Sequence, residues 1–75
     1  MMRENILKIV NEIRQAKGLN VLEFIRENQT LRNDLELTSF DLAELTVKIE
    51  DEYDIDIFED GLVNTVGEIF AKLSK

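Results

Sequence analysis

One serine stands out because its surroundings favour modification over catalysis. Ser39 follows a short loop in which leucines alternate with polar residues, and it precedes a segment with helical apolar spacing. The 75-residue chain has no histidine and no cysteine, so it offers neither an imidazole base nor a thiol nucleophile. A hydroxyl that its own chain cannot activate is a place where another enzyme could attach a group. Ser39 is therefore the first candidate site.

The ordinary alternative is that Ser39 caps a helix, which is the commonest reason for serine at a helix start. Thr38 can cap the same helix, however, and Thr38-x-x-Asp41 fits a capping box, in which two side chains satisfy backbone N–H groups. One cap residue is enough. Ser39 would then occupy the first helical position with its hydroxyl free to point outward.

A second candidate site lies on the helix that follows. Phe40, Ala43 and Val47 have helical spacing but lie about a quarter-turn or more from the main apolar stripe, and we name them the apolar strip. The strip is either part of a wide buried face or a docking surface for a partner with a shallow groove and basic edges. The spacing favours neither. The acidic residues around the strip, which we name the acidic rim, are Asp41, Glu44, Glu50 and Asp51.

The acidic run from residue 50 to residue 60 does not have the spacing of a calcium loop. Such a loop needs oxygen ligands at its first, third and fifth positions. Starting at Asp56 puts Phe58 at the third position, and starting at Asp54 puts Phe58 at the fifth. We expect no dedicated metal site. The three glycines are isolated, so no phosphate-binding loop is present, and we expect no enzymatic activity.

Composition indicates a single small domain spanning residues 1–75. Apolar residues make up 44% and charged residues 33%, as in folded soluble proteins. The absence of cysteine fits a reducing cytoplasm, where we expect the protein to be found as a monomer. The pattern after Met1 alternates polar and apolar residues, so we expect neither a signal peptide nor a membrane span.

The charge is unevenly distributed. Residues 1–32 have a net charge of +2 and residues 33–75 have a net charge of −9. An acidic half repels the phosphates of nucleic acids and attracts basic protein surfaces. We therefore expect protein partners and no nucleic acid.

Apolar periodicity predicts an all-α protein, a small four-helix bundle with three main helices and a short third helix. The main helices are expected at residues 2–16, at residues 39–53 and from Thr65 onward, where Thr65 and Glu68 form a second capping-box pattern. Gly18 is expected to end the first helix. The connection over residues 19–38 is expected to contain one or two helical turns near residues 21–25. The short helix is expected at residues 58–63.

Together these residues resemble the acyl carrier protein family, over residues 27–73. The family's signature Asp-Leu-Gly-x-Asp-Ser-Leu reads here Asp34-Leu35-Glu36-Leu37-Thr38-Ser39-Phe40. Glu44-Leu45 and the acidic segment at residues 50–57 follow in the family's order, and Thr65-Val66-Gly67-Glu68 matches the start of its last helix. Each motif is weak alone, but their order and spacing together are specific.

The resemblance implies that Ser39 carries a covalent 4′-phosphopantetheine, which a phosphopantetheinyl transferase moves from coenzyme A. The thiol of this arm would carry acyl groups as thioesters between partner enzymes with basic docking surfaces, in fatty-acid, polyketide or related specialised biosynthesis. Leu42, Leu45, Thr46, Ile49 and Ile69 would be walls of an acyl-chain shelter. The partner-docking positions implied by the family are Phe40, Asp41, Ala43, Glu44, Val47, Glu50 and Asp51.

The chain departs from the family pattern at several positions. Thr38 replaces the usual aspartate before the serine, Glu36 replaces a glycine, and Phe40 replaces a leucine. Phe58 stands in place of a proline. Two alternatives remain open. One is an aminoacyl or D-alanyl carrier, and the other is an unmodified interaction domain that has kept the bundle and its acidic face.

Overall fold

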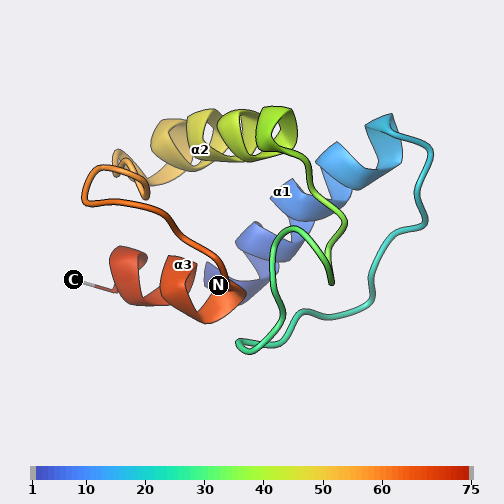
Figure 1. Ribbon diagram of the computed structural model, residues 1–75, viewed down its shortest axis with the longest axis horizontal. Helices are drawn as coiled ribbons and strands as arrows, with labels where there is room; N and C mark the ends of the chain where they lie inside the picture. The colour runs from blue at the N-terminus through green and yellow to red at the C-terminus, as the bar shows by residue number, and fades with distance from the viewer. Residues whose placement is uncertain (1, 75) are drawn as a thin grey trace.

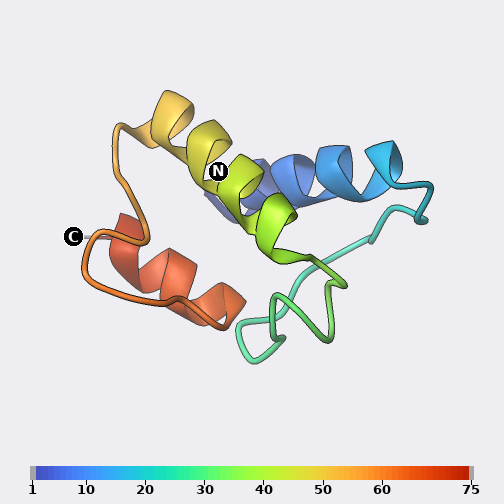
Figure 2. The same cartoon turned by 45° about the horizontal axis from the view of Figure 1, so that its top comes forward.

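The computed structural model describes residues 2–74, which form three helices. Helix α1 spans Met2–Ala16, α2 spans Ser39–Tyr53 and α3 spans Val66–Leu73. Helices α1 and α2 lie against each other, α3 packs below them, and the long connection after α1 loops around one side (Figures 1 and 2). The prediction of an all-helical domain with three main helices is confirmed, and no strand occurs within residues 2–74.

The helix ends follow the local signals in the sequence. Thr38 and Thr65 are the N-caps of α2 and α3, and both capping boxes are formed. Gly18, two residues after the end of α1, has a φ of 83°, a left-handed conformation that glycine adopts without steric cost. These three predictions from sequence are confirmed.

The core is a single cluster of aliphatic side chains with one phenylalanine at its edge. It draws on all three helices and on both connections between them, so each connection is held to the helices by its own leucines, isoleucines or valines. The buried apolar residues are Ile6, Ile9, Val10, Ile13, Ile25, Leu31, Leu35, Leu37, Leu45, Ile49, Ile57, Val63, Val66, Ile69 and Phe70.

Backbone hydrogen bonds fix the long connection to the start of α3. Leu31 N–H donates to the Asn64 carbonyl at 2.8 Å, and Val66 N–H donates to Gln29 at 3.0 Å. Residues 30 and 65 also form an isolated antiparallel bridge. Because Leu31 is fully buried as well, the backbone that leads into residue 32 is held in place.

The prediction of a short helix at residues 58–63 is wrong. Residues 57–60 form turns, in which Glu59 N–H donates to Asp56 and Gly61 N–H donates to Phe58. The Asp56 carboxylate also accepts the Phe58 N–H at 2.9 Å, a local side-chain bond that competes with helix formation. Gly61 then has a φ of 135°, which a helix cannot contain. The helical turns expected at residues 21–25 are also absent from this part of the described chain.

No helix within residues 2–74 has both the length and the apolar composition needed to cross a bilayer.

Glu36, in the loop before α2, has a left-handed backbone with a φ of 58°. This conformation costs a residue other than glycine about 1–2 kcal/mol. It lets the chain turn between Leu35 and Leu37, which are both buried. The Glu36 carboxylate lies 3.5 Å from Nη1 of the buried Arg14, and the Glu36 carbonyl accepts from Lys17 Nζ at 2.6 Å. At this position, where the family pattern has glycine, Glu36 therefore keeps the left-handed backbone conformation that glycine favours.

We predict that Glu36→Gly is more stable than Glu36→Ala by about 1 kcal/mol. Both substitutions remove the carboxylate near Arg14, so the difference between them isolates the backbone conformation. Urea denaturation of the two variants, with the wild type as reference, measures it. Equal stability of the two variants, or a more stable alanine variant, would contradict the left-handed backbone at this residue.

Candidate functional site

The candidate serine occupies the first helical position of α2, where its side chain is exposed. The Thr38 hydroxyl accepts the Asp41 N–H at 3.2 Å, and the Asp41 carboxylate accepts the Thr38 N–H at 2.9 Å. The first intrahelical bond runs from Leu42 N–H to the Thr38 carbonyl. Thr38 and Asp41 thus form the cap without help from Ser39, whose hydroxyl takes no part in starting the helix.

The structure corrects the expectation for Asp41, which is not part of an exposed acidic rim. Its side chain is buried, with 5% of the residue exposed. Besides closing the capping box, its carboxylate accepts from Lys17 Nζ at 2.6 Å. The reason is geometric, because a capping-box residue turns back over the helix start and here meets the lysine that follows α1. Asp41 therefore holds the start of α2 against the end of α1, and its side chain is largely withdrawn from the surface.

Opposing effects act on the acidity of Asp41. Burial of the carboxylate raises its pKa, but hydrogen bonds from Lys17 and Thr38, together with the charge of Lys17, outweigh burial and hold the pKa below its ordinary value of 3.8. Asp41 is therefore ionised at neutral pH, and its ion pair with Lys17 joins the start of α2 to the end of α1.

Arg14 holds the loop before Ser39 from the same side of the molecule. This buried side chain donates from Nη1 to the Leu35 carbonyl at 2.8 Å and from Nε to the Asn20 carbonyl at 3.1 Å. Arg14 and Lys17 thus bind consecutive carbonyls, those of residues 35 and 36. Two cations at the end of α1 fix the segment that leads to the serine.

Sequence reasoning missed a cation next to the candidate serine. Arg32 donates from Nη2 to Ser39 Oγ at 2.5 Å. Both side chains are exposed, and Arg32 forms no ion pair with a carboxylate within residues 2–74. The two residues are seven positions apart across a loop, so no helical or strand period could have indicated their contact.

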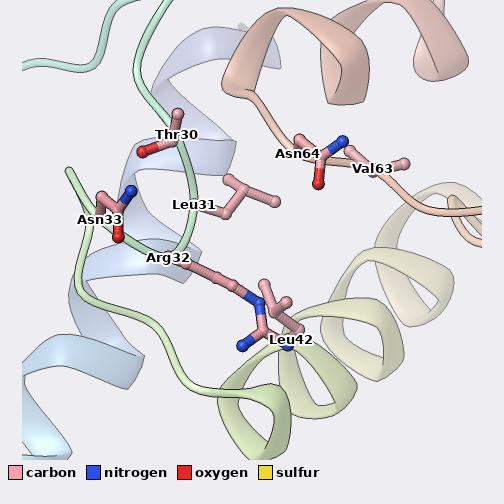
Figure 3. A pocket seen from close by; sticks show the side chains of 7 residues that line it. All are labelled: Thr30, Leu31, Arg32, Asn33, Leu42, Val63 and Asn64. Carbon is pink, nitrogen blue, oxygen red and sulfur yellow. The ribbon is translucent and has the colours of Figure 1, made fainter.

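Two hollows meet beside this pair. The first, of about 270 Å³, is shown in Figure 3. There the Arg32 side chain extends towards Leu42. Asn64 and Val63 lie on the opposite side of the hollow. The second, of about 250 Å³, lies next to Ser39, and Arg32 and Leu42 line both. The residues around the second hollow are Arg32, Ser39, Leu42, Ala43, Thr46, Phe58 and Leu62.

The residues expected to shelter an acyl chain are divided between the core and the surface. Leu45, Ile49 and Ile69 are fully buried in the core cluster. Leu42 and Thr46 are half-buried and line the hollow next to Ser39. Leu62, which sequence reasoning did not select, borders the same hollow and is 85% exposed.

The remaining docking candidates do reach the surface of α2. In the apolar strip, Phe40 is 79% exposed and Val47 is 60% exposed, and Ala43 is also exposed. In the acidic rim, Glu50 and Asp51 are exposed and Glu44 is half-exposed. An apolar strip left uncovered on a small domain is typical of a surface that meets another molecule.

Comparison with known protein families identifies a match. The family model described as the phosphopantetheine attachment site matches residues 7–73. Neither a curated protein nor a solved structure matches the chain. The match begins within α1, covers both connections and α2, and ends at the last residue of α3, and it therefore includes Ser39 and its surroundings.

We predict that Asp41→Asn lowers the free energy of unfolding at neutral pH by about 1–2 kcal/mol, because it removes the ionised half of the capping box and of the ion pair. The folded carboxyl has the lower pKa, so the unfolded chain takes up the proton first as pH falls. The stabilisation is full above the ordinary pKa of 3.8 and is lost as pH falls through the folded value. Denaturation curves at pH 7 and over a pH series that extends well below 3.8 measure the difference.

Asp51→Asn is the matched control, because Asp51 is an exposed aspartate on the same helix. It should leave stability at pH 7 close to that of the wild type. If the deficit of Asp41→Asn were as large in acid as at pH 7, ionisation of Asp41 would not be what stabilises the helix start.

Proposed function

Because the chain belongs to the phosphopantetheine attachment site family, we propose that it is an acyl carrier protein in which Ser39 holds 4′-phosphopantetheine. Members of this family carry that group covalently. The observation that supports Ser39 most directly is its exposed hydroxyl at the first position of α2, relieved of capping by Thr38. The resulting phosphodiester would make the chain a phosphoprotein.

The attachment reaction is a phosphoryl transfer that another enzyme must catalyse. Ser39 Oγ forms a bond to the phosphorus next to the pantetheine unit of coenzyme A, and the phosphoanhydride bond of coenzyme A breaks. The nucleotide portion leaves, and the hydroxyl proton passes to a base of the transferase. The chain contains no histidine to serve as that base, which fits a role as substrate of the transferase and not as an enzyme.

The residues around Ser39 fit a phosphate-linked arm. The N-terminal end of α2 carries partial positive charge, which favours a phosphate, and Arg32 adds a full positive charge at the attachment atom. The hollow beside Ser39 is lined mainly by apolar side chains and offers room for the start of a flexible chain. When bound, the arm supplies a thiol that carries acyl groups as thioesters.

We further propose that α2 is the docking helix for the transferase and for acyl-handling enzymes. The apolar strip would contact a shallow groove, and Glu44, Glu50 and Asp51 would meet basic residues around that groove. Asp41 is left out of this surface because Lys17 and Thr38 already hold its carboxylate. Such contacts allow the fast exchange that a carrier needs.

Fatty-acid, polyketide or related specialised biosynthesis is the proposed setting, with the reducing cytoplasm as the compartment and a monomer as the working form. An aminoacyl or D-alanyl cargo is the alternative within the same mechanism. The alternative to a carrier is an unmodified interaction domain. One observation favours it: position 38 holds threonine in place of the family's usual aspartate. The first experiment separates that reading from a carrier.

We predict that incubation with coenzyme A and a broad-specificity phosphopantetheinyl transferase adds the mass of one phosphopantetheine group. Ser39→Ala should gain no mass, because the attacking oxygen is removed. Intact-mass spectrometry gives the result directly.

Thr38→Asp tests the neighbouring departure in the same assay. An aspartate can still cap the helix and restores the charge found in the family, so modification should proceed at least as fast as in the wild type. If several transferases all left the wild type unmodified, the unmodified interaction domain would replace the carrier as the conclusion.

We predict that Glu44→Lys combined with Asp51→Lys lowers kcat/KM of the transferase for this chain on the order of tenfold at low salt. The reversed charges would repel a basic docking surface and slow association. The effect should shrink as ionic strength rises, because exposed charges are screened. Transferase kinetics over a salt series measure both quantities.

Glu12→Lys combined with Glu23→Lys is the matched control, with the same change in net charge at exposed residues outside α2. Circular dichroism should show unchanged helicity in all variants. An equal loss of kcat/KM in the control pair would assign the effect to overall charge and remove the acidic rim from the docking surface.

A further inference from the structure

The Arg32 guanidinium contacts Ser39 but belongs neither to the helix cap nor to the proposed docking surface. It donates to the attachment atom, Ser39 Oγ, at 2.5 Å. Its charge is not balanced by a carboxylate within residues 2–74, although the whole chain carries sixteen acidic residues. Arg32 is therefore a cation without a carboxylate partner in the described residues, next to the oxygen that would become part of a phosphodiester.

The backbone that carries Arg32 is held in place by its neighbours. Leu31 is fully buried and bonded to Asn64, and the Leu37 N–H donates back to the Leu31 carbonyl at 3.0 Å. The Asp34 carboxylate accepts the Thr30 N–H at 2.8 Å, which closes the turn around residue 32. Only the side chain of Arg32 is left to move, so little ordering is required when it binds an anion.

The Arg32 side chain lies between the two hollows, and this position indicates in which of them an attached group would begin. Arg32 extends past Leu42 so that it borders both the hollow facing Asn64 and the hollow facing Phe58 and Leu62. A group attached to Ser39 begins in the second hollow, since Ser39 lines that one and not the first. If Arg32 bound the phosphate, the first atoms of the phosphopantetheine arm would lie in the second hollow, beside α2.

We propose that Arg32 is a phosphate-positioning residue, whose guanidinium leaves the Ser39 hydroxyl once that oxygen is phosphorylated and pairs with the nonbridging oxygens of the phosphodiester. The inference rests on the proposed attachment of phosphopantetheine at Ser39. The nonbridging oxygens lie one bond beyond Oγ, within reach of a side chain that already contacts Oγ. Two parallel N–H donors of a guanidinium match a phosphate better than the single ammonium of a lysine. The pair restrains the root of the arm and leaves its thiol end free.

The test compares the modified and unmodified forms of four chains: wild type, Arg32→Gln, Arg32→Lys and Arg26→Gln. Arg26 is an exposed arginine of the same connection without a contact to Ser39, so Arg26→Gln is matched in charge change. Mass spectrometry first establishes that each chain is modified. The ³¹P resonance of the modified chains then reports motion at the phosphate, and melting temperatures of both forms report coupling between residue 32 and the phosphate.

Arg32→Gln should give a narrower, more mobile ³¹P resonance than the wild type, and it should lower the melting temperature more in the modified form than in the unmodified form. Arg32→Lys should recover part of both effects, and Arg26→Gln should match the wild type. In the wild type itself, the Arg32 Nε–H signal should shift on modification and exchange more slowly with water. Raising the salt concentration should weaken the restraint.

Equal ³¹P mobility in wild type and Arg32→Gln, with equal melting losses in the two forms, would overturn the role of Arg32 while leaving the attachment of phosphopantetheine intact. An unchanged Arg32 Nε–H signal in the modified wild type would do the same without any variant. Failure of the wild type to gain mass would instead overturn the proposed function, and the phosphate contact with it.

Discussion

The position of the candidate serine depends on one carboxylate, that of Asp41. It accepts the Thr38 N–H and so starts α2, and it accepts Lys17 Nζ and so ties that start to the end of α1. The Asp41 carboxylate therefore takes part both in the local helix cap, which sets the direction of α2, and in the tertiary ion pair, which fixes where α2 begins. Burial makes both stronger, because an ionised carboxylate withdrawn from water depends on these partners for its charge. Ser39 is positioned without using its own hydroxyl.

The loop before Ser39 is held by side chains as well as by backbone hydrogen bonds such as that from the Leu37 N–H to the Leu31 carbonyl. Arg14 and Lys17 each bind a carbonyl, at residues 35 and 36, and the leucines on either side of Glu36 are buried. Turning between two buried leucines requires a left-handed residue here, which explains why the backbone stays left-handed although the family's glycine is a glutamate. The glutamate adds conformational strain but brings a negative charge to the buried Arg14. The departure from the family pattern is thus partly compensated within the same loop.

The sequence predicted the features that depend on near neighbours and missed those that depend on tertiary placement. The bounds of α1 and α2, and both capping boxes, follow from periodicity and from pairs three residues apart, such as Thr65 and Glu68. The short helix at residues 58–63 failed because the Asp56 side chain and Gly61 favour turns, a competition that apolar spacing does not register. The burial of Asp41 and the contact of Arg32 with Ser39 needed knowledge of where α1 ends and how the connection folds back.

The charge layout of the docking face gives modification an effect beyond attachment. The exposed acidic residues lie along α2, Glu44 in its middle and Glu50 and Asp51 towards its end, whereas Arg32 places a positive charge beside its first residue. A basic partner approaching the unmodified chain is attracted along the helix and repelled at Ser39. A phosphodiester at Ser39 would offset the charge of Arg32 and so remove the repulsion at this end of the face. Under the proposed function, enzymes that act on the loaded carrier would therefore meet a more uniformly attractive surface than the transferase does, so one attached group would both carry the cargo and favour the partners that use it.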